Sequence, residues 1–200
     1  MGRPRTITDE EILHAAAALF LERGPTTRTS DIADALGISE GTIFKRFPTK
    51  DLLLRRALLF EPLNLEPFLT ESVGGAPVSE TLASVVRQLI AFYIEMLPRA
   101  MMLRHVGAFD PMKEFQGDPD APPLRVIHAI TSYLSAEAQR GRIHLRDPEP
   151  AARMLMGAAM NHAFFGVSGI PGHDRLDEKQ YANEVVQTLL EGIRSPGGTA

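Results

Sequence analysis

Residues 27–50 restrict the possible folds more than any other part of the chain. They read TRTSDIADALGISEGTIFKRFPTK. Apolar residues three and four apart predict one short helix over residues 30–36 and a second over residues 40–47. Thr29 and Ser39 are suitable N-caps, and the glycine between the two helices allows a tight turn. Two short helices on such a turn form a helix-turn-helix, although similar shapes also occur inside enzymes as plain packing motifs.

The rest of the chain also shows helical periodicity. Thr8 and Glu11 form a capping box at the start of a helix that Gly24 ends. Apolar spacing predicts further helices over residues 9–23, 50–58, 79–97, 100–108, 124–140, 147–165 and 179–193. No segment alternates with the period of two that a half-buried strand requires. The predicted fold class is therefore all-α, with about nine helices.

Proline and glycine interrupt this periodicity within residues 61–77. We therefore expect a helix-turn-helix domain over residues 1–60 and an effector-binding and dimerisation domain over residues 61–200. Residues 1–60 carry nine basic and eight acidic side chains, whereas the rest carries twelve and seventeen, within a net charge of −4. This mild asymmetry permits DNA binding by the first domain without requiring it.

The second helix of the motif has small and basic residues on its outer side. Apolar residues hold this helix from behind, which suits its insertion into the major groove of DNA. The candidate DNA contacts are Arg28, Thr29, Ser30, Ser39, Glu40, Gly41, Thr42, Phe44, Lys45 and Lys50. Gly41 would let the backbone approach the groove floor, and Lys45 can reach a guanine or a phosphate. Arg3 and Arg5 form a short basic arm that can enter an adjacent minor groove.

A wider residue pattern joins the motif to its flanking helices. It consists of Ile12 to Phe20, Gly24, Thr29, Asp31 to Ala33, Leu36 to Ser39, Gly41 to Phe44, Phe47, Pro48 and Lys50 to Leu53. As a set, these residues resemble the DNA-binding domain of the TetR family of transcriptional regulators. The family usually has Tyr where this chain has Phe44, so one hydroxyl that could bind a phosphate is missing. The resemblance implies a homodimer whose C-terminal domain controls the spacing of two DNA-binding helices. It favours a repressor that a small, largely apolar effector releases from a palindromic operator.

Apolar residues of the C-terminal half supply candidate contacts to such an effector. Methionine and aromatic side chains make adaptable pockets, in which a few polar groups orient the ligand. The candidates are Phe92, Tyr93, Met96, Met102, His105, Phe109, His128, Tyr133, Asn161, Phe164 and Phe165. Taken singly, such residues more often complete a core than bind a ligand.

The last two predicted helices carry the candidate dimer contacts. Two helices from each copy would form a four-helix bundle around a two-fold axis, and the resemblance places dimerisation there. The candidates are Leu155, Ala159, His162, Val186, Leu189, Leu190 and Ile193. The alternative is that these residues complete the core of a single chain.

Other functional classes find little support. The absence of cysteine excludes disulfides and thiolate metal sites, and the histidines lack metal-ligand spacing, so we expect no metal and no cofactor. The chain has no Gly-rich phosphate loop and no nucleophile elbow, which argues against a helical enzyme. Without a signal peptide or an apolar membrane span, a cytoplasmic protein is expected. A ligand-dependent activator and a ligand-binding protein of the same fold without DNA function remain alternatives.

Overall fold

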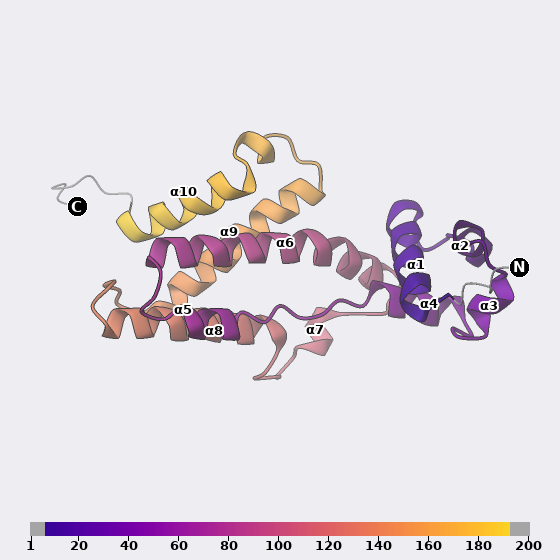
Figure 1. Ribbon diagram of the computed structural model, residues 1–200, viewed down its shortest axis with the longest axis horizontal. Coiled ribbons are helices and arrows are strands. Elements are labelled where there is room, and N and C mark those ends of the chain that lie inside the picture. The colour runs from indigo at the N-terminus through magenta and orange to yellow at the C-terminus, as the bar shows by residue number, and fades with distance from the viewer. Residues whose placement is uncertain (1–6, 193–200) are drawn as a thin grey trace, which may run out of the picture. The chain divides into compact units, whose positions relative to one another are not determined.

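The computed structural model describes residues 7–192, which form helices joined by short loops (Figure 1). The helices are α1 (Asp9–Arg23), α2 (Thr29–Leu36), α3 (Glu40–Phe44), α4 (Lys50–Leu58), α5 (Glu66–Ser72), α6 (Val78–His105), α7 (Pro111–Glu114), α8 (Pro122–Gln139), α9 (Pro148–Val167) and α10 (Glu178–Glu191), with one 3-10 turn, η1 (His173–Arg175). These described residues contain no strand, which confirms the predicted all-α class.

The chain divides into two compact units. The first unit contains the chain up to Glu61 together with Pro98–Gln116, and the second contains Pro62–Leu97 and the chain from Gly117 onward. Helix α6 therefore contributes residues to both units. The boundary between the two functional domains, which we expect between residues 60 and 61, stays a prediction. A compact unit is not by itself a functional domain.

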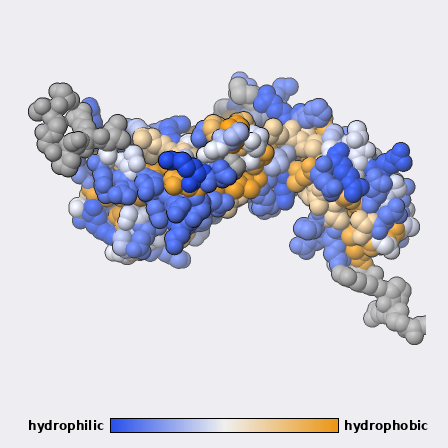
Figure 2. Space-filling view, turned by 90° about the horizontal axis from the view of Figure 1, so that it is seen from above, coloured by the Kyte–Doolittle hydropathy of each residue, from blue (hydrophilic) through white to orange (hydrophobic). Residues whose placement is uncertain are grey.

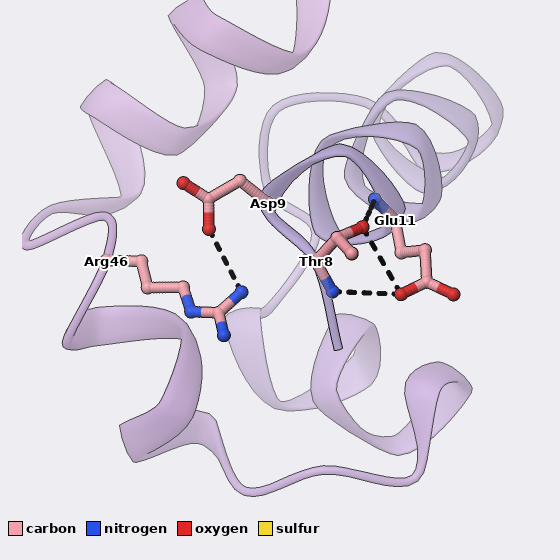
Figure 3. A network of polar contacts seen from close by, with 4 residues as sticks. All are labelled: Thr8, Asp9, Glu11 and Arg46. Atoms are coloured by element: carbon pink, nitrogen blue, oxygen red, sulfur yellow. Dashed lines mark hydrogen bonds and ion pairs between the residues drawn. The ribbon is translucent and has the colours of Figure 1, made fainter. Parts of the chain in front are cut away.

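The first unit packs α1 against α2 and α4. Ile12 and Phe20 of α1 are fully buried in its core. The predicted capping box is confirmed: the Glu11 N–H donates to Thr8 Oγ1 at 3.1 Å, and the Thr8 N–H donates to Glu11 Oε2 at 2.9 Å (Figure 3). Gly24 follows the helix with a φ of 83°, a conformation that favours glycine. Local sequence signals therefore set both ends of α1.

Side chains of the first unit also join the places where the chain enters and leaves it. The Phe109 ring lies 6.4 Å from Phe60 and 5.8 Å from Phe115, measured between centroids, with edge-to-face geometry. Arg99 Nη1 donates to the Leu59 carbonyl oxygen at 3.3 Å. The chain passes between the two units at three places, after Glu61, after Leu97 and after Gln116. Each of these places lies within two residues of one of the side chains just named, Phe60, Arg99 or Phe115.

Three helices differ from the prediction because of prolines. Helix α6 runs through Pro98, where the sequence predicts a break. Proline removes one backbone hydrogen bond and costs about 3 kcal/mol or more inside a helix. Burial of Tyr93 before it and Leu103 after it offsets this cost. Helix α5 lies within residues 61–77, where the periodicity is interrupted, and α7 lies between two predicted helices. Neither was predicted as a helix, but Pro67 and Pro111 occupy their first turns, where proline is tolerated.

The second unit packs α8 against α5 and α9, and α10 against α9. Its core contains one fully buried carboxylate, that of Glu137 on α8. Arg142 Nη1 lies 3.0 Å from Glu137 Oε2, and the Gly74 N–H donates to Glu137 Oε1 at 2.7 Å. Arg142 also donates to the carbonyl oxygen of Ala76. This network joins the end of α8 to the connection between α5 and α6.

Candidate DNA-binding surface and effector site

Helix α3 is short, and hydroxyl groups fix its first turn. The Thr42 N–H donates to Ser39 Oγ at 3.3 Å, and the hydroxyl oxygens of these two residues lie 2.9 Å apart. Ser39 is therefore the N-cap, as predicted. Gly37 has a left-handed φ of 64°, which permits the tight turn from α2. The helix ends at Phe44, earlier than predicted, because the following turn brings Phe47 into the core.

The two sides of α3 differ in exposure. Ile43 is fully buried, whereas Glu40, Gly41, Phe44 and Lys45 are exposed and Thr42 is half-buried. A shallow depression on this surface is lined by Ser39, Gly41, Thr42, Lys45 and Arg46. The structure thus brings four of the predicted DNA contacts, Ser39, Gly41, Thr42 and Lys45, together in one place, next to the basic side chain of Arg46.

Of the other predicted DNA contacts, one is buried and two lie outside the described residues. Arg28 is exposed, and Ser30 and Lys50 are half-buried. Thr29 is buried and is the first residue of α2, so Arg28 occupies the N-cap position without a side-chain cap bond. The prediction of Thr29 as the N-cap is therefore wrong, and its contact with DNA stays a prediction for a residue whose side chain is buried. Arg3 and Arg5 lie outside the described residues.

Arg46 is a basic residue of this surface that the sequence prediction missed. Its Nη1 lies 2.9 Å from Oδ1 of Asp9, the first residue of α1 (Figure 3). The basic pair of Lys45 and Arg46 was visible in the sequence. The partner of Arg46 was not, because Asp9 lies 37 positions earlier in the sequence.

Replacing Gly41 with alanine should separate DNA binding from stability. A Cβ atom at this position would meet only Ser39 Oγ, at an ordinary 3.8 Å. We expect the free energy of unfolding to stay the same or to rise by up to about 1 kcal/mol, because alanine favours helix. DNA binding should weaken by about 1–3 kcal/mol, the scale of one lost base contact. Thermal unfolding and a DNA titration check the two parts. Unchanged DNA affinity would show that the backbone at Gly41 does not approach the groove.

The second unit contains a partly open cavity of about 620 Å³ between α8 and the segment that includes α5. Its apolar lining consists of Pro62, Leu63, Leu65, Leu69, Val73, Val126, Ala129 and Ala136. Two of the predicted effector contacts, His128 and Tyr133, also line it, together with Arg125 and Ser132. Burial raises the pKa of Tyr133 above its ordinary value, so the phenol is neutral and can donate a hydrogen bond. The cavity therefore combines apolar walls with a few polar groups.

The other predicted effector contacts do not line this cavity. Asn161 and Phe165 line a separate groove of about 470 Å³ between α9 and α10. Tyr93 is buried in the core of the second unit, where burial raises its pKa to about 12, and Phe92 and Met96 pack against that core. Phe164 and His105 are exposed, and Met102 and Phe109 pack against the core of the first unit. Methionines and aromatics at helical spacing thus mostly complete the two cores.

The predicted dimer contacts also divide into two groups. Leu155, Ala159 and Val186 are buried within the chain itself, so they have almost no surface for a second copy, and their prediction is corrected. His162 is buried too and stacks on Tyr181 with 4.2 Å between centroids. Leu189 is half-buried and Leu190 is exposed, and Ile193 lies outside the described residues. The alternative that these positions complete a core holds for the buried residues.

A different face of α9 carries exposed apolar side chains. Met154, Met160 and Phe164 have 62%, 39% and 42% of their surface exposed. Gly157 lies between them in sequence and is exposed as well. Figure 2 shows apolar surface, in orange, on the second unit among polar areas. Leu155, Ala159 and His162, the predicted dimer contacts on α9, lie on its buried side instead.

Comparison with known protein families assigns a family to most of the chain. Residues 12–57 match the family of bacterial regulatory proteins called tetR, and residues 80–191 match the AefR-like transcriptional repressor, C-terminal domain. The chain belongs to the TetR family. This TetR-family protein is a transcription regulator with a helix-turn-helix DNA-binding domain and a ligand-binding C-terminal domain. TetR-family proteins are DNA-binding regulators and not enzymes, so the helical-enzyme interpretation is excluded.

Solved structures of other proteins share the fold of this chain. A TetR-family transcriptional regulator from Mesorhizobium loti is 25% identical, with a TM-score of 0.61 over 92% of this chain and 95% of the other. PfmR from Thermus thermophilus is 21% identical, with a TM-score of 0.64 over 92% and 99%. FadR from Bacillus subtilis, solved in complex with stearoyl-CoA, is 19% identical, with a TM-score of 0.60 over 94% and 100%. No curated protein sequence matches significantly.

The described residues, 7–192, show neither a metal-binding cluster nor a membrane-spanning helix. No group of three His, Asp or Glu side chains in this range is placed to hold a metal ion. No helix in the same range has the length and apolar character needed to cross a membrane.

Proposed function

We propose that this TetR-family regulator is a homodimeric repressor that leaves a palindromic operator when a small, largely apolar effector binds. The observation that carries the proposal is the exposed outer side of α3 at Gly41 and Lys45, backed by buried Ile43. An exposed helix with a small residue and a basic residue suits direct contact with base edges in the major groove. The match of the C-terminal half to an AefR-like repressor domain favours repression.

Residues of α3 and of the segment that follows it have specific roles in this proposal. Gly41 allows the backbone to approach the groove floor, and Thr42 contacts a phosphate or a thymine methyl group. Lys45 reaches a guanine or a phosphate, and exposed Glu40 accepts a hydrogen bond from a cytosine amino group. Lys50, at the first turn of α4, binds a phosphate together with the free amide groups of that helix.

The effector binds the cavity of about 620 Å³ in the second unit. A cavity of this size suits a ligand of the size of a drug or metabolite. His128 and Tyr133 orient the ligand, and the apolar walls supply most of the binding free energy. The fold is shared with a FadR that binds stearoyl-CoA, which supports an effector with a large apolar part. One wall begins at Pro62, directly after the last residue of the DNA-binding unit, so the ligand contacts a segment that continues into that unit.

Dimerisation uses the exposed face of α9 that contains Met154, Met160 and Phe164. An apolar face of this kind is unusual on a protein that stays monomeric. A two-fold axis through it would supply two α3 helices, one for each half of a palindrome. An effector releases the DNA only if it binds more tightly to a dimer whose α3 spacing does not match two successive major grooves.

Selection of bound DNA from a random pool tests the proposal. The wild-type protein should enrich a palindrome with two half-sites about one helical turn apart. A reporter promoter that overlaps this palindrome should fall in activity when the protein is expressed. An increase would instead identify a ligand-dependent activator. No enriched sequence at low salt would leave only a ligand-binding protein without DNA function.

The Lys45→Ala variant tests the role of α3 on the selected palindrome. We expect binding to weaken by about 1–3 kcal/mol, with relaxed preference at one position in each half-site, if Lys45 contacts a base. A uniform loss across sequences with a shallower salt dependence would indicate a phosphate contact instead. Titrations at several salt concentrations distinguish the two. Wild-type affinity on every sequence and at every salt concentration would contradict both roles.

A further inference from the structure

Arg46 and Asp9 connect the DNA-binding surface to the beginning of α1. Arg46 follows Lys45 directly and lines the same depression as Gly41 and Thr42. Its Nη1 lies 2.9 Å from Asp9 Oδ1, and its side chain keeps 27% of its surface exposed. Figure 3 shows the guanidinium group directed from the α3 side toward the first turn of α1.

The position of Asp9 is well defined. It is the first residue of α1 and lies between Thr8 and Glu11, whose two backbone-to-side-chain hydrogen bonds fix the first turn. The N-terminus of a helix also stabilises a negative charge, so a carboxylate is favoured at this place. Asp9 therefore gives Arg46 an anchor that is itself held in place.

Asp9 accepts a hydrogen bond from only one of the N–H groups of Arg46. A guanidinium has five N–H donors in a rigid planar arrangement, and the contact with Asp9 uses one of them. Two oxygens of a phosphate suit such a planar pair of donors. A side chain that is already oriented loses less freedom when it binds than one that must be ordered.

We propose that Asp9 is a positioning residue of the DNA interface. It holds the Arg46 guanidinium so that the remaining N–H groups meet a backbone phosphate beside the groove that α3 contacts. An acidic side chain therefore strengthens binding to a polyanion. This inference rests on the proposed DNA binding of α3.

The opposite expectation is simple electrostatic repulsion. A negative charge near DNA should weaken binding, and its removal should then tighten it. Glu10 supplies a matched control, because it neighbours Asp9 in the same first turn and is exposed. Glu10→Gln removes the same charge as Asp9→Asn but leaves the Arg46 contact in place. The sign of the change in affinity thus distinguishes positioning from repulsion.

The experiment measures the affinity of the full-length protein for its selected palindrome over a range of salt concentrations. We expect Asp9→Asn to weaken binding several-fold and Glu10→Gln to leave it unchanged or slightly tighter. Arg46→Ala should weaken binding about tenfold and lower the salt slope by about one for each subunit. Arg46→Lys keeps the charge, so it should preserve the slope while losing the planar geometry.

A double-mutant cycle decides the mechanism even if Asp9→Asn lowers stability. In the Arg46→Ala background, Asp9→Asn should cause no further loss of affinity, because the residue that it positions is absent. Equal losses in both backgrounds, or tighter binding by Asp9→Asn alone, would overturn the proposal. Failure of the wild-type protein to bind any DNA would instead refute the proposed function.

Discussion

Replacement of Arg142 by alanine is expected to destabilise the second unit by about 3–5 kcal/mol. The substitution removes the cation 3.0 Å from Glu137 Oε2 and leaves a fully buried carboxylate with only the Gly74 N–H as a partner. It also removes the hydrogen bond from Arg142 to Ala76, which holds the connection between α5 and α6. An unpaired buried charge is among the most costly changes that a single substitution can make.

Urea unfolding followed by tyrosine fluorescence measures this effect. The chain has three tyrosines and no tryptophan. Tyr93, Tyr133 and Tyr181 all lie in the second unit, so the signal reports on that unit alone. The midpoint for Arg142→Ala should fall far below that of the wild type.

Two further variants make the result specific. Arg153→Ala removes an exposed ion pair with Glu149, at 2.7 Å, and should cost about 0.5 kcal/mol or less. Glu137→Gln in the Arg142→Ala background removes the buried charge but keeps an acceptor for the Gly74 N–H. This double variant should regain a large part of the lost stability. Equal, small losses for Arg142→Ala and Arg153→Ala would show that burial of Glu137 does not make its pair important.

The Phe164→Glu substitution is expected to convert the proposed dimer into monomers. Phe164 lies on the exposed apolar face of α9 with Met154 and Met160. Two glutamates brought together near a two-fold axis would lose their hydration and repel each other. A monomer binds one half-site at a time, so affinity for the full palindrome should fall by about 10²–10⁴-fold.

Sedimentation velocity gives the mass of the particle, and a DNA titration gives the affinity. Ile94→Glu is the matched control, because Ile94 is 40% exposed, belongs to the same unit and lies on α6 instead of α9. It should leave both the mass and the affinity unchanged. A Phe164→Glu protein that remains dimeric would place the interface elsewhere. A wild-type monomer would contradict the homodimer itself.

Local signals made much of the first unit predictable. The Thr8 and Glu11 capping box, the Ser39 cap and the Gly37 turn each depend on residues only a few positions apart. Such signals are complete within a short window, so a single sequence contains them. The helix-turn-helix and its exposed outer side therefore followed from the sequence with few errors. The N-cap at Thr29 was an error because two hydroxyl residues in succession, Thr29 and Ser30, left the helix start ambiguous.

Features that depend on tertiary contacts were not predictable in this way. Pro98 predicts a helix end, and only burial on both sides of it explains why α6 continues. The apolar character of α9 did not show which of its sides is exposed: Ala159 is buried in the chain while Met160 is exposed. A helix that is apolar on several sides carries no local signal that tells core from interface. The Asp9 partner of Arg46 was hidden for a related reason, because their contact joins distant parts of the sequence.

The contacts of Phe109 with Phe60 and Phe115, and the bond from Arg99 to Leu59, have a mechanical consequence. Three separate connections between two bodies can bend independently of one another. In this chain, side chains of the first unit join all three, so a displacement of one connection strains the other two. In the proposed mechanism, the DNA-binding unit would then respond to the effector by moving as a rigid body and not by local loosening.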